Sequence, residues 1–131
     1  MNSHWSLSLV RVAAVLATLL ALYQGLSGIG WVGGPHGLHP HVGETAAVLM
    51  VLAAVGAFVW SRRSGEKGLF MHALGMVVVA GAQIALGYAG VREAHMAVGL
   101  LFLVGAAALG TLSWRRPAVD DAPVDPSRLR G

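Results

Sequence analysis

Residues 69–88 read LFMHALGMVVVAGAQIALGY, a run of 20 residues without Lys, Arg, Asp or Glu. An α-helix needs about 20 predominantly apolar residues to cross the hydrocarbon core of a bilayer. The run predicts a transmembrane helix, because backbone groups in lipid must form their hydrogen bonds within the segment. Three further stretches of similar length and character lie at residues 9–30, 41–60 and 94–114.

The composition of the whole chain supports a membrane protein. Of its 131 residues, 56% are hydrophobic and only 11% are charged, whereas a soluble domain carries roughly 25% charged residues. The expected fold is all-α: an integral membrane four-helix up-down bundle over residues 1–116. Residues 117–131 are polar and rich in proline, and we predict that they form a disordered cytoplasmic tail.

The positions of the basic residues predict the topology. The formal net charge is +3, but the basic residues cluster at the ends of the apolar stretches, which argues against nucleic acid binding. The connection at 31–40 has no Lys or Arg. The positive-inside rule then predicts a multi-pass protein of the cell membrane, with both termini in the cytoplasm, the His-rich loop outside, and lipid as the main partner. The cytoplasmic markers are Arg62, Arg63, Lys67, Arg115 and Arg116.

The two halves of the chain resemble each other. When residue 41 is aligned with residue 95, both segments continue to a tryptophan and then to a pair of arginines. This pattern predicts a duplicated helical hairpin with a pseudo-two-fold axis along the membrane normal. The matched pairs are His41 with His95, Trp60 with Trp114, Gln24 with Gln83 and Gly28 with Gly87.

Two histidines at matching positions suggest a cofactor. The second and fourth helices of an up-down bundle lie on a diagonal, so His41 and His95 would face each other at one depth near the outer surface. Two neutral imidazoles on opposite sides of a haem suit its two axial positions. The chain has no cysteine, so a haem b, or a haem of the o or a type, would be held non-covalently. Alternatively, both histidines cap helix ends or bond between helices.

Nearby residues are compatible with this pocket. Gly99 and Thr45 lie one turn below the two histidines and leave room for a porphyrin edge. Arg92 is a natural partner for haem propionates, although it could instead pair with Glu93 or lipid headgroups. Glu44 lies within a predicted membrane helix, where an ionisable group is a functional candidate. It could act catalytically, orient the histidine beside it, or simply face headgroups.

Two other functions fit the sequence. The stretch HGLHPH brings three histidines together in one loop, so His36, His39 and His41 could hold copper or zinc at the outer face. The abundant Gly and Ala residues would also suit a non-catalytic membrane subunit or scaffold that packs against a partner protein.

The stretch QIALGYAGVREAHMAVGLLFLVGAAAL, at residues 83–109, resembles the haem A synthase family, as does the placement of histidines on the second and fourth helices. That family has two four-helix bundles, and the resemblance covers one of them. It implies that His41 and His95 ligate haem iron for electron transfer or haem handling. If the chain is an enzyme, the resemblance implies a haem A synthase-like oxidoreductase. It also implies assembly as a homodimer or within a larger respiratory or haem-biosynthesis complex. Glu44 follows His41 here, whereas the family's catalytic Glu precedes its histidine.

Overall fold

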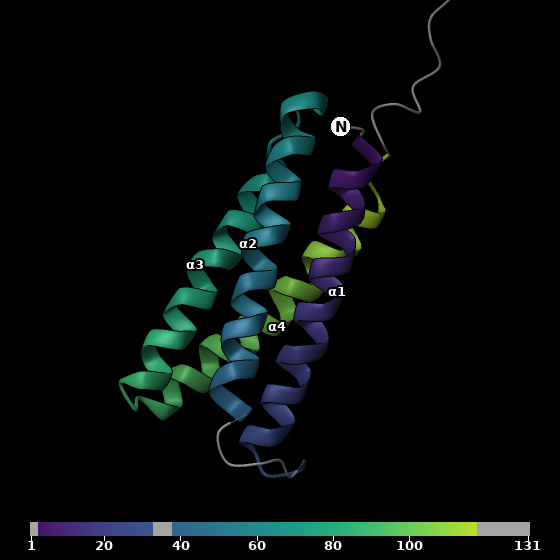
Figure 1. Cartoon of the computed structure of the whole chain (residues 1–131). Helices are drawn as coiled ribbons and strands as arrows, with labels where there is room; N and C mark the ends of the chain where they lie inside the picture. The colour runs from purple at the N-terminus through teal and green to yellow at the C-terminus, as the bar shows by residue number, and fades with distance from the viewer. Residues whose placement is uncertain (1–2, 33–37, 118–131) are drawn as a thin grey trace, which may run out of the picture.

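The computed structural model describes residues 3–32 and 38–117 and contains four long helices (Figure 1). They are α1 (Ser3–Gly28), α2 (Leu38–Ser64), α3 (Gly68–Tyr88) and α4 (Arg92–Trp114). All four are long and apolar enough to cross a membrane, which confirms the expected all-α multi-pass architecture. The predicted disordered tail falls, apart from Pro117, on residues outside those described.

The helices follow one another around the bundle. α1 packs against α2 and α4, and α3 also packs against α2 and α4. The helices α2 and α4 therefore lie on one diagonal, as predicted. Figure 1 shows the end of α1, the start of α2 and the α3–α4 connection at one end of the bundle, which we call the hairpin end. The start of α1, the α2–α3 connection and the end of α4 lie at the other, which we call the basic end. The membrane side that each end faces stays a prediction.

Small side chains form most of the core. Eleven of the buried core residues are alanines with little or no exposed area, and they line the contacts between all four helices. Close backbone approach of this kind is how membrane helices gain packing energy when lipid removes the hydrophobic driving force. Larger apolar side chains such as Leu19, Val78 and Leu100 are more than half exposed and are free to contact lipid. The alanines are Ala13, Ala14, Ala17, Ala21, Ala46, Ala53, Ala54, Ala57, Ala73, Ala80 and Ala106.

One polar contact joins α3 to α4 within the apolar region. His72 Nε2 lies 2.9 Å from the carbonyl oxygen of Gly105, which can only accept, so Nε2 carries the proton. The thioether of Met76 packs against the same glycine: a Cβ built at Gly105 would overlap the Met76 sulfur. His72 therefore serves the α3–α4 contact.

Cationic contacts tie the helices together at the basic end. The Arg11 guanidinium on α1 donates to the carbonyl oxygens of Ser113 (3.2 Å) and Arg116 (3.0 Å), which lie at and beyond the end of α4. It also stacks 4.7 Å from the Trp114 ring centre. Arg11 thus binds carbonyl oxygens at the C-terminal end of α4, where a helix lacks its full set of internal donors. An ion pair joins Arg116 to Glu66 in the α2–α3 connection.

The start of α2 differs from the sequence-based expectation. The apolar run predicted a helix from residue 41, but α2 begins at Leu38 and includes Pro40 in its first turn. Proline is tolerated there because the first N–H groups of a helix have no internal acceptor. His39 consequently lies on the helix rather than in the preceding loop.

We predict that Gly56→Ala destabilises the bundle. A Cβ at this position would lie 2.8 Å from the backbone carbonyl oxygen of Ser6 and 3.1 Å from Val10, so α1 and α2 would have to separate. Overpacking of this kind costs about 1–3 kcal/mol. Denaturant unfolding in detergent micelles measures the change.

Gly75→Ala on α3 is the matched control, since its Cβ would meet no atom within 4 Å. Replacing helical Gly by Ala there should stabilise the protein by up to about 1 kcal/mol. Equal effects of both substitutions would contradict the close α1–α2 contact.

Candidate functional site

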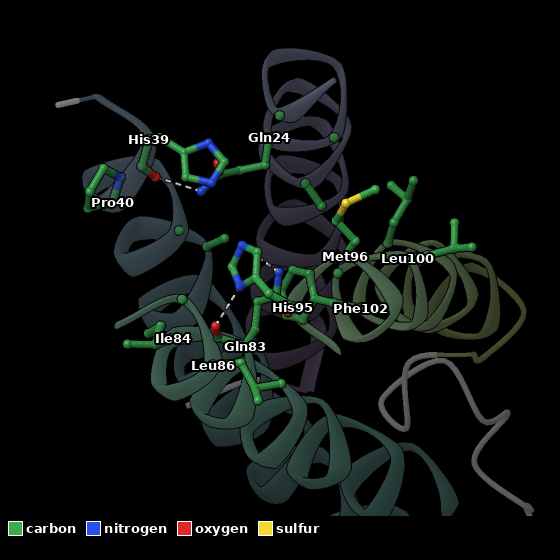
Figure 2. A pocket seen from close by; sticks show the side chains of 18 of the residues that line it. Gln24, His39, Pro40, Gln83, Ile84, Leu86, His95, Met96, Leu100 and Phe102 are labelled. Atoms are coloured by element: carbon green, nitrogen blue, oxygen red, sulfur yellow. Dashed lines mark hydrogen bonds between the residues drawn. The ribbon is translucent and has the colours of Figure 1, made fainter. Parts of the chain in front are cut away.

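A cavity of about 750 Å³ opens at the hairpin end between all four helices (Figure 2). Its walls are mainly apolar, with a small number of polar side chains that converge on the interior. Ligand pockets in proteins typically have volumes of about 300–1,000 Å³ and this kind of lining. The polar residues that line it are Gln24, His39, Glu44, Gln83, Tyr88, Arg92 and His95.

His39 and His95 face each other across this cavity. Their ring centres are 6.1 Å apart, and the ring planes are tilted by 51°. Figure 2 shows the two imidazoles turned toward one another, one from the first turn of α2 and the other from the first turn of α4. The diagonal helices therefore deliver one imidazole each to the same place.

Both rings use Nδ1 for contacts with the protein. His95 Nδ1 lies 3.0 Å from the carbonyl oxygen of Gln83, so Nδ1 carries the proton and Nε2 keeps its lone pair. His39 Nδ1 lies 3.4 Å from Ser27 Oγ. Because this hydroxyl donates its own proton to the carbonyl oxygen of Gln24, it is left as an acceptor for His39. In both rings Nε2 therefore keeps its lone pair, and in His95 the side-chain amide of Gln83 lies against it.

Two glutamines stand beside the histidines. Gln24 Nε2 on α1 donates to the carbonyl oxygen of His39 at 2.6 Å, and Gln83 Nε2 on α3 lies 3.3 Å from His95 Nε2. The side-chain oxygen Oε1 of each glutamine is buried without a hydrogen-bond partner among the described residues. An unpaired buried acceptor costs about 1–3 kcal/mol.

Glycines make room for these amides. A Cβ at Gly43 would lie 2.9 Å from Gln24 Nε2, and one at Gly99 would lie 2.8 Å from Gln83 Nε2. In each hairpin the glutamine therefore crosses to the neighbouring helix over a glycine one turn below the cavity histidine. The prediction that Gly99 leaves space in the pocket is consistent with this arrangement. The side-chain amide of Gln83, however, occupies the space beside Gly99.

The internal repeat has a different register from the one predicted. His39 and Gly43 on α2 match His95 and Gly99 on α4 at a spacing of 56 residues, and the local sequences are HPHVG and HMAVG. Buried positions follow the same spacing, as the equivalent pairs below show. The expected alignment of residue 41 with residue 95 pairs buried residues of α2 with exposed residues of α4 and is wrong for the folded chain. The buried equivalents are Ala46 and Phe102, Met50 and Ala106, Ala53 and Leu109, and Ala54 and Gly110.

The structure does not bring His41 to His95. The His41 side chain is 76% exposed and does not line the cavity. Its Nδ1 lies 3.5 Å from Glu44 Oε2. Two residues along a helix correspond to a rotation of about 200°, so His41 and His39 lie on opposite faces of α2. Thr45 does not line the cavity either. Its hydroxyl donates to the carbonyl oxygen of His41 within the same helix.

Glu44 and Arg92 lie at the rim of the cavity. Glu44 Oε1 accepts a hydrogen bond of 3.0 Å from the Tyr88 hydroxyl, so the carboxylate links α2 to α3 at the cavity wall. Arg92 also lines the cavity and has no ion-pair partner in the described ranges. The alternative pairing of Arg92 with Glu93 is therefore not observed.

The predicted three-histidine metal site is not assembled in the described part of the chain. No group of three His, Asp or Glu side chains there is close enough together to hold a metal ion. His36 lies outside the described residues, while His39 and His41 point to different surroundings. The residues that sequence reasoning missed as cavity residues are His39, Tyr88 and the two glutamines. The shared pattern His–x–x–Val–Gly could have revealed His39.

No protein-family model matches the chain, and no curated protein or solved structure matches it. The resemblance to the haem A synthase family stays a prediction from the sequence.

We predict that Gln24→Met and Gln83→Met each change the free energy of unfolding by less than about 1 kcal/mol. Each removes one hydrogen bond of that magnitude but also removes a buried unpaired oxygen, and the two effects offset each other. Unfolding followed by circular dichroism in micelles measures the difference. A loss of more than about 2 kcal/mol would mean that the amides are fully bonded within the protein.

Proposed function

We propose that this chain is a haem-binding membrane protein in which His39 and His95 are the two axial ligands of one haem. The observation that carries the proposal is the pair of imidazoles facing each other from diagonal helices, each with Nδ1 turned to the protein and a lone pair on Nε2. Binding of a metal at His95 would displace the Gln83 amide from Nε2. The proposal keeps the cofactor expected from the sequence and replaces His41 by His39 as the partner of His95.

The spacing of the rings suits one shared metal ion. Because metal–imidazole bonds are about 2 Å long, each ring centre lies about 3 Å from the metal, and two rings on opposite sides of it are about 6 Å apart. The ring centres of His39 and His95 are 6.1 Å apart. In addition, Nδ1 of His95 donates to a backbone carbonyl, which is the usual way in which a ligating imidazole is oriented and made more basic.

The cavity walls also suit a haem. Apolar side chains from all four helices provide an environment for a macrocycle, and the cavity volume falls in the range of cofactor pockets. Arg92 at the rim, without a carboxylate partner, is the group best placed to pair with a propionate. Since the chain has no cysteine, the attachment would be non-covalent.

Two protein ligands imply a particular chemistry. A haem with both axial positions occupied by histidine supplies one-electron transfer and offers no free position to oxygen. His39 and His95 would hold it, while Arg92 would hold its acidic edge near the membrane surface. We therefore propose electron transfer at the hairpin end of the bundle as the activity of this site.

The test is the visible absorption spectrum of the protein purified in detergent after expression with a haem precursor. We expect the spectrum of six-coordinate low-spin haem b in the wild type. Both His39→Ala and His95→Ala should lose it, because each removes one axial ligand, and added imidazole should restore it in part.

His41→Ala is the matched control, because it removes a histidine two residues away on the other face of the same helix turn. Its spectrum should equal that of the wild type. Loss of the spectrum in His41→Ala but not in His39→Ala would overturn the assignment of ligands. Absence of haem from the folded wild-type protein, even after reconstitution with hemin, would overturn the proposed function.

A further inference from the structure

A second hollow lies at the basic end of the bundle, far along the helices from His39 and His95. It is an open groove of about 420 Å³ between the last turns of α2 and the first turn of α3. We call it the basic-end groove. Its lining residues are Phe58, Ser61, Arg62, Gly65, Lys67, Phe70 and Met71.

Cationic groups line one side of this groove. Arg62 and Lys67 are exposed, and neither has an acidic partner among the residues that the structure describes. The one carboxylate in the connection, Glu66, pairs with Arg116, which follows the end of α4. The charge of the groove is therefore left uncompensated by the protein.

The helix that starts here adds to this positive potential. Lys67 occupies the N-cap position of α3 and provides no side-chain hydrogen bond to the first turn. The first N–H groups of a helix lack internal acceptors and carry the positive end of its dipole. They face the same end of the bundle as the Arg62 and Lys67 side chains.

The opposite side of the groove is apolar. The rings of Phe58 and Phe70 meet edge to face with their centres 5.3 Å apart, and Met71 beside them is 57% exposed. The hydroxyl of Ser61 donates to the carbonyl oxygen of Phe58 within its own helix, so it offers little polarity. A cationic side and an apolar side thus meet where α2 and α3 reach the membrane boundary.

We propose that the basic-end groove binds one anionic phospholipid, with Arg62 and Lys67 on its phosphate and an acyl chain along Phe58, Phe70 and Met71. A soluble phosphate compound would use the cationic side alone, and the apolar side favours a lipid. Basic pockets between membrane helices are a recognised way of holding acidic headgroups. The proposal does not depend on haem binding, since no residue is shared by the two sites.

Native mass spectrometry of the detergent-purified protein, titrated with equal amounts of phosphatidylglycerol and phosphatidylcholine, tests the proposal. We expect one phosphatidylglycerol to be retained in preference to phosphatidylcholine. Arg62→Gln and Lys67→Gln should each weaken its binding about fivefold, as expected for the loss of one basic contact near an acidic headgroup. Glycerol phosphate, which has the headgroup chemistry without acyl chains, should not displace the lipid.

Arg63→Gln is the matched control. It removes the same charge as Arg62→Gln, one residue further along the helix, and the Arg63 side chain does not line the groove. Its lipid binding should stay close to that of the wild type. Equal losses in Arg62→Gln and Arg63→Gln would overturn the site, as would equal retention of the two lipids. Displacement by glycerol phosphate would overturn the lipid as occupant. Phosphatidylglycerol should also raise the melting temperature of wild type and Arg63→Gln but not of the double variant Arg62→Gln/Lys67→Gln.

Discussion

Close packing of small side chains is the constraint on which this bundle depends. In lipid, apolar helices gain nothing from leaving water, so they hold together only where their backbones approach closely enough for dense contact. The alanine-rich core provides that approach, and Gly56 marks its tightest point against the backbone of α1. Any feature that needs space inside the bundle must therefore interrupt this packing.

The cavity at the hairpin end is such an interruption. Larger polar side chains, His39, Gln24, His95 and Gln83, take the place of alanine there, and each glutamine needs a glycine opposite to fit. Buried amide oxygens and paired imidazoles reduce stability unless a ligand uses them. One such histidine and one such glutamine occur in each hairpin, at equivalent positions. This repetition is better explained by a shared role than by chance. A site shared equally by two diagonal helices is also suited to a ligand with two similar faces.

The two ends of the molecule have different chemistry for physical reasons. At the hairpin end the four helices enclose a cavity, and among the described residues that line it Arg92 is the sole Arg or Lys side chain. At the basic end, Arg11 and Arg116 join α1, α4 and the α2–α3 connection through carbonyl oxygens and a carboxylate. That end is held together by polar contacts, which leaves Arg62 and Lys67 available for groups outside the protein. A cofactor at one end and a lipid at the other are therefore compatible with the same four-helix frame.

The amino-acid sequence alone determined the number of helices, their membrane-spanning character and the diagonal placement of α2 and α4. The first two follow from local composition, because about twenty predominantly apolar residues in lipid have no alternative to a helix. The diagonal placement follows from the order of neighbouring helices in an up-down bundle. Tertiary structure decided which histidine faces His95. The apolar run suggested a helix starting at residue 41, but α2 begins at Leu38 with Pro40 in its first turn. This places His39 at the open cavity and His41 on the outer face of α2, since two residues along a helix correspond to a rotation of about 200°. The rotation of α2 about its own axis, which decides which side chains face the cavity, is set by packing against α1 and α3. Composition carries little information about that rotation.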